Sequence, residues 1–169
     1  LSLHDALPSL LPRANPGLRD DYYALIGFRR CQLEEPEALR RARLSNPDAP
    51  RNQHFLDAAP QTMAADGVIP FLHTARDFTG EGKLGDYFAF GLLPVDLEGD
   101  RCVPLAQAPS ELLPVSDVPT FLERVASNTG YIIHPEEIMA DNFVHWAMQR
   151  EDLADPAIPL AIGRFWAEH

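Results

Sequence analysis

Two carboxylates and one imidazole within residues 129–152 have the types and the spacing that could do chemistry. Glu137 and Asp141 are four residues apart, so a helix would place both carboxylates on one face, about one turn apart. His134 lies one turn before Glu137. Acidic residues at a helix start are commonplace because the helix dipole favours them, so a purely structural role stays open. Carboxylates on a mostly apolar helix still need partners, because burying them unpaired is costly.

The residues around His134 predict where this helix begins. His134 precedes Pro135, and a residue before proline is biased away from helical backbone. Pro135 suits the first helical turn, where its missing N–H costs nothing. Glu136 and Glu137 then fall in the turn where the dipole favours negative charge. We therefore predict a helix that begins at Pro135, with Glu136 facing solvent.

The spacing Glu137-x-x-x-Asp141 resembles the second motif of the Glu-zincin metallopeptidases. The wider string YIIHPEEIMADNF, residues 131–143, resembles the HPEE-(I/L)-x-A-(D/E)-NF segment of uncharacterised bacterial zinc-peptidase-like proteins. The resemblance extends loosely over residues 22–147, through YALIGF, NPDAP and NTGYIIHPEEI. It implies a zincin-like C-terminal portion, a zinc cofactor and a peptide or protein substrate.

The resemblance also implies roles for two residues, and the position of His134 one turn before Glu137 makes it a third candidate. Glu137 would be the third zinc ligand, and Asp141 would hold a histidine ligand through the other ring nitrogen of that histidine. His134 is the catalytic candidate, as a donor to the oxyanion, although it could equally only cap the helix.

The chain departs from the Glu-zincin pattern in one large respect, because none of its six histidines begins a His-Glu-x-x-His motif. Those enzymes take two zinc ligands and the general base from that motif. Either the motif lies upstream of Leu1 in a longer protein, or this chain is not an active peptidase. We expect zinc in the full-length protein, and weak or absent zinc binding by this chain.

Two alternatives remain open. His134-x-x-Glu137 also matches the His-x-x-Glu zinc pair of carboxypeptidase-like folds, which need a later histidine ligand. His145 is too near on the same helix to be a natural choice, although a two-turn arrangement with Glu137 or Asp141 is possible. The other alternative is a non-catalytic α+β interaction or structural domain, whose acidic residues only cap helices and form ion pairs with arginine.

The amino-acid composition limits the classes of protein to which this chain could belong. The chain has 169 residues, 46% of them hydrophobic and 23% charged, which predicts a globular domain with a sizeable core. Residues 1–51 hold 8 Arg and 7 acidic residues, whereas residues 52–169 hold 6 basic and 18 acidic ones. An acidic chain without a basic stripe argues against nucleic acid and against anionic membranes. No stretch approaches the roughly 18 apolar residues of a membrane span, and no signal peptide is evident.

Local patterns predict an α+β fold, a small antiparallel sheet with packed helices. Strands are expected at residues 53–56, 67–74, 87–95 and 101–105, and the main helices at residues 18–26, 34–44, 116–126, from 135 onward and 159–168. Pro70 indicates an edge or a bulge. The cluster Arg40, Arg41 and Arg43 is predicted to be a solvated helix face. Cys31 and Cys102 could pair, but the sequence does not decide this, so the compartment is not predicted.

Residues 1–17 have an unusual composition for a native start. LSLHDALP resembles a translated sequencing-adapter read, so we expect a non-native or disordered arm over residues 1–17. Residues 18–169 are then expected to form a single α+β domain, incomplete at its N-terminal side.

Overall fold

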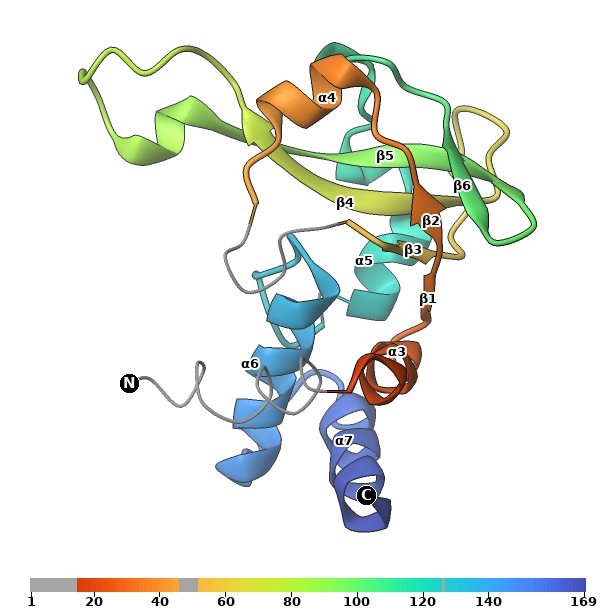
Figure 1. Cartoon of the computed structure of the whole chain (residues 1–169). Coiled ribbons are helices and arrows are strands. Elements are labelled where there is room, and N and C mark those ends of the chain that lie inside the picture. Colours follow the sequence, from red (N-terminus) through yellow and green to blue (C-terminus); the bar gives the residue numbers. More distant parts are fainter. Residues whose placement is uncertain (1–14, 46–51, 126) are drawn as a thin grey trace. The chain divides into compact units, whose positions relative to one another are not determined.

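The computed structural model describes residues 15–45, 52–125 and 127–169. These residues form two compact units, a helical unit (residues 15–29 with Thr120–His169) and a sheet unit (Arg30–Pro119). In chain order the elements are α3 (Pro16–Ala24), β1 (Phe28–Arg30), β2 (Gln32–Leu33), α4 (Glu37–Ala42), β3 (His54–Leu56), β4 (Gly67–Thr74), η1 (Leu84–Tyr87), β5 (Phe88–Glu98), β6 (Arg101–Pro104), η2 (Pro109–Glu111), η3 (Val115–Asp117), α5 (Pro119–Val125), α6 (Pro135–Ala147) and α7 (Ala157–Glu168) (Figure 1).

The sheet has six strands in the order β1-β3-β4-β5-β6-β2. The β3–β4, β4–β5 and β5–β6 pairs are antiparallel, whereas β2 pairs with β6 in parallel. β1 and β2 stand at opposite ends of this order, yet only Cys31 separates them in the chain. The sheet is therefore nearly closed into a barrel. The α+β class is confirmed, but the prediction of a small antiparallel sheet is wrong, because the short β1 and β2 add pairings that local periodicity cannot reveal.

A disulfide joins Cys31 to Cys102, two residues separated by 71 positions in the sequence. Cys102 lies on β6 opposite Leu33 of β2, so the bond fastens the point where the two ends of the sheet approach each other. Both cysteines belong to the core of the sheet unit, together with Leu39, Phe55, Ile69, Phe71, Leu93, Val95 and Ala106. The pairing that the sequence left open is thus present.

Two prolines, Pro70 and Pro94, lie within the long β4–β5 pair. Pro70 faces Leu92, whose own N–H and C=O bond to Leu113 on the far side of β5. By the alternation of an antiparallel ladder, the nitrogen of Pro70 then faces the β3 side, where β3 pairs only as far as Val68. Pro70 thus occupies a local edge, as predicted. Pro94 lies inside β5, and its carbonyl accepts a hydrogen bond from the Leu105 N–H.

The helical unit is held by aromatic packing between α3, α6 and α7. The Tyr22 ring lies 5.3 Å from Phe165 and 5.4 Å from Trp166 between centroids. α6 and α7 approach closely at Gly163, where an added Cβ would lie 2.4 Å from Nε1 of Trp146. The helix predicted from Pro135 is confirmed, because α6 begins there.

The first residues of α3 fall within the arm expected over residues 1–17. Asn15 caps the helix, its side chain accepting from the N–H of Leu18 at 3.3 Å, and Pro16 and Gly17 form the first turn. Residues 1–14 lie outside the described residues. Among the helices that the structure describes, none is long and apolar enough to cross a membrane.

Candidate functional site

His134 caps the start of α6. Its backbone is extended (φ −159°, ψ 146°), as expected before Pro135, and its Nδ1 accepts a hydrogen bond from the Glu136 backbone N–H at 3.1 Å. The side chain is buried. Because an accepting ring nitrogen carries no proton, neutral His134 must hold its proton on Nε2.

This tautomer distinguishes two of the hypotheses for His134. The Nε2–H group can donate a hydrogen bond to an oxyanion while Nδ1 keeps the cap. Neither nitrogen can bind zinc in that state, because a ligating nitrogen must be unprotonated and Nδ1 is already engaged. A zinc pair of the type His134-x-x-Glu137 would therefore require loss of the helix cap.

Glu136 is buried, with 5% of its surface exposed, so the prediction that it faces solvent is wrong. Its Oε2 accepts a hydrogen bond from the phenol of Tyr23, which lies on α3 and is itself buried. Burial raises the pKa of Tyr23 far above its ordinary value, and the charge of Glu136 and its hydrogen bond raise it further. Tyr23 therefore stays protonated and continues to donate to the carboxylate.

The rings of Tyr23 and His134 meet edge to face, with centroids 6.3 Å apart and an interplanar angle of 83°. Tyr23, His134 and Glu136 thus form one buried polar cluster at the start of α6. The sequence could not show it, because Tyr23 and Glu136 are 113 positions apart.

Glu137 and Asp141 follow on successive turns of α6, and both are half-buried. Asp141 Oδ2 accepts a hydrogen bond from the hydroxyl of Thr129, and that hydroxyl also accepts the Tyr131 backbone N–H at 2.9 Å. Asp141 thereby anchors the turn that leads into the helix. Glu137 and Asp141 are neither fully buried nor fully exposed, which leaves the zinc hypothesis untested.

His145 is directed toward another partner. Its Nε2 lies 3.1 Å from the carbonyl oxygen of Asn128, and since a carbonyl can only accept, Nε2 carries the proton. The Asn128 side chain also bonds to Asn142 Oδ1 at 2.9 Å and to the Asp155 carbonyl at 2.6 Å. His145 therefore belongs to a network that ties α6 to the loops on either side of it.

Few of the described side chains are placed to bind a metal ion together. Within residues 15–45, 52–125 and 127–169, no three His, Cys, Asp or Glu side chains are grouped closely enough to hold a metal ion. Glu137 can supply one carboxylate and Asp141 can support a neighbouring ligand, which fits part of a zinc site. The remaining ligands would have to come from residues other than these.

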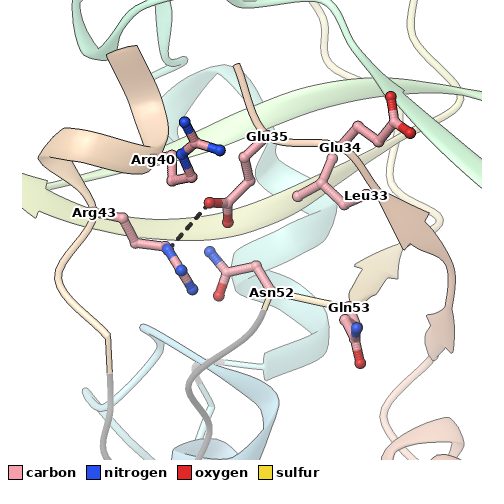
Figure 2. Close-up of a pocket in the computed structure, with 7 residues that line it drawn as sticks. All are labelled: Leu33, Glu34, Glu35, Arg40, Arg43, Asn52 and Gln53. Carbon is pink, nitrogen blue, oxygen red and sulfur yellow. Dashed lines mark ion pairs between the residues drawn. The ribbon is translucent and has the colours of Figure 1, made fainter. Parts of the chain in front are cut away.

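The sequence patterns did not predict a polar pocket that lies in the sheet unit (Figure 2). Arg43 does not lie on a solvated helix face as predicted. It follows the last residue of α4, and its Nε lies 3.2 Å from Oε2 of Glu35, with both side chains largely buried. Burial raises the pKa of Glu35, while Arg43 and Arg40 oppose that rise. In the sequence, Glu35 and Arg43 lie eight residues apart on either side of α4, and this spacing is the signal that could have indicated the ion pair.

Comparisons with protein families, with curated proteins and with solved structures find no match for this chain. The resemblance of residues 131–143 to zinc-peptidase-like proteins therefore rests on the residues alone.

Proposed function

We propose that this chain is part of a zinc-dependent metallopeptidase-like protein, to which α6 contributes one zinc ligand and the group that supports another. Glu137 is the ligand. Asp141 orients a histidine ligand that the rest of that protein supplies, and it does so by accepting a hydrogen bond from the second ring nitrogen of that histidine. When bound, zinc would activate water and polarise a peptide carbonyl.

The observation that carries this proposal is the position of Glu137 and Asp141. They lie one turn apart on a helix with a fixed start, and both are half-buried. Thr129 holds Asp141 through its hydroxyl, which restricts the carboxylate to a narrow range of orientations. A supporting carboxylate needs that restriction, because it has to fix the ring of the ligand that it contacts.

His134 contributes a proton donor in this scheme. Its cap keeps Nδ1 unprotonated and leaves the proton on Nε2, the tautomer that can donate to a developing oxyanion. The Tyr23–Glu136 pair packs beside the imidazole and limits its movement. His134 therefore acts as a donor, and the carboxypeptidase-like use of His134 as a zinc ligand is disfavoured.

The test is an assay of peptide hydrolysis with and without a chelator, on this chain and on the longer protein that the proposal requires. We expect no hydrolysis by the present chain and chelator-sensitive hydrolysis by the longer protein. Asp141→Asn should lower the zinc affinity of the longer protein roughly 10–100-fold. Chelator-sensitive hydrolysis by the present chain would contradict the proposal, because it would require a complete site within these residues.

A non-catalytic α+β module is the second candidate, and the contacts of the acidic residues favour it. Glu136 binds Tyr23, Asp141 binds Thr129, and His134 caps the helix, so each of these side chains has a structural use. If that is their whole role, Glu137→Gln and Asp141→Asn will change the free energy of unfolding and will leave zinc affinity unchanged.

A further inference from the structure

The disulfide between Cys31 and Cys102 closes the sheet at a point where the backbone pairing is short. β2 is two residues long, and it pairs in parallel with β6 through Gln32 and Leu33, the second of which faces Cys102 (Figure 1). A pair of strands of that length is marginal in water by itself. The covalent bond therefore fixes a pairing that the backbone of β2 would hold only weakly.

Both cysteines lie inside the core of the sheet unit. Cys31 is 3% exposed and Cys102 is 2% exposed, and both pack in one cluster with Leu39, Phe71 and Leu93. Thiol–disulfide exchange requires a thiolate to reach one of the two sulfur atoms. The surrounding core therefore shields the finished bond from reductants, and the bond has to form while this core is still open.

The bond uses both cysteines that the chain contains, so neither thiol is left for metal binding or catalysis. The two residues are separated by 71 positions, and a cross-link over such a distance removes many conformations from the unfolded chain. Both observations indicate a structural bond on which the sheet unit depends.

We propose that this chain folds in an oxidising compartment, where a disulfide donor supplies the Cys31–Cys102 bond. Disulfides form and persist in such compartments and are rare in the reducing cytosol. The thiolate of one cysteine attacks the disulfide of the donor, which forms a mixed disulfide and releases one donor thiol. The thiolate of the other cysteine then attacks the cysteine sulfur of the mixed disulfide and releases the second donor thiol. The chain thereby loses two electrons and two protons, which the donor gains.

This proposal is independent of the zinc proposal, because it uses neither Glu137 nor Asp141. Its test compares two preparations of the whole chain, one made in the reducing cytosol of a bacterial host and one exported to the periplasm by an added signal sequence. Thiols are alkylated with iodoacetamide in urea and counted by mass spectrometry. We expect two alkylated thiols per chain from the cytosol and none from the periplasm. Trypsin should digest the cytosolic form at least about tenfold faster, because loss of the bond raises the population of open chain.

The double variant Cys31→Ser with Cys102→Ser is the matched control, because it cannot form the bond in either compartment. Export should leave its rate of digestion unchanged. A second measurement needs no variant: dithiothreitol should reduce the bond of the exported chain at least about 100-fold more slowly in buffer than in urea, because the core shields it.

Four results would overturn the proposal. The first is an exported chain that keeps two free thiols, and the second is a reduced cytosolic chain that resists trypsin as well as the exported one does. The third is a double variant that export protects as much as it protects the natural chain. The last is a bond that dithiothreitol reduces equally fast in buffer and in urea.

Discussion

The buried hydrogen bond between Tyr23 and Glu136 should be one of the largest single polar contributions to the stability of the helical unit. Tyr23→Phe removes the phenol oxygen and keeps the ring, so it opens no sizeable cavity at a residue that is only 1% exposed. The loss is one hydrogen bond to a carboxylate, which is worth about 1.5–3 kcal/mol, and the carboxylate remains buried. We therefore expect a decrease of about 2 kcal/mol in the free energy of unfolding.

Tyr22→Phe is the matched control for this prediction. Tyr22 is equally buried on the same helix, but its hydroxyl lies 3.5 Å from the Met139 carbonyl, at the limit of a hydrogen bond, and its other polar neighbour, Trp166, is uncharged. Its loss should cost under about 1 kcal/mol. Urea unfolding followed by circular dichroism measures both variants.

A double-mutant cycle with Glu136→Gln then isolates the Tyr23–Glu136 interaction, and its coupling energy should be about 1 kcal/mol or more. The reasoning is refuted if Tyr23→Phe costs no more than Tyr22→Phe, or if the coupling energy is zero.

Two further predictions concern the disulfide and alkaline pH. Replacing Cys31 and Cys102 together by Ser should lower the free energy of unfolding by roughly 4 kcal/mol in urea titrations, because the bond closes a loop between residues 71 positions apart; equal midpoints for the variant and the oxidised protein would contradict this. Burial raises the pKa of Tyr22 and Tyr23 above the ordinary value of 10.0. The two protonated phenols therefore contribute fully to stability below about pH 10, and this contribution is lost as the pH rises through their folded-state pKa values. Above about pH 10 the free energy of unfolding should fall by about 1.4 kcal/mol per pH unit for each tyrosine, and a value that stays constant between pH 9 and about pH 11 in urea titrations would show that the phenols already ionise in the folded state.

Much of the secondary structure could be predicted because its signals are local. The strand predicted at residues 67–74 has the same bounds as β4, and the helix predicted from Pro135 begins at the same residue as α6. Proline geometry and alternating burial act over a few residues, so a single sequence displays them. The order of the six strands could not be predicted, because it depends on the pairing of β2 with β6. That pairing joins Gln32 to Arg101, two residues far apart in the sequence.

The candidate site was only partly predictable for the same reason. The i, i+4 spacing of Glu137 and Asp141 is a local property. The burial of Glu136 depends on Tyr23, and the position of Asp141 depends on Thr129 in the preceding turn. Sequence patterns predicted that Glu136 is solvated, because its partner Tyr23 lies on a helix that is far away in the sequence.

Zinc analysis of the longer protein that we propose decides whether α6 belongs to a metal site. We expect that protein to carry an HExxH motif and to bind one zinc per chain, which Glu137→Ala should remove and Glu168→Ala should leave in place, because Glu168 is exposed at the end of α7. If the protein lacks the motif and binds no zinc, or if its zinc is unaffected by Glu137→Ala, the zinc proposal is wrong and α6 is a structural helix.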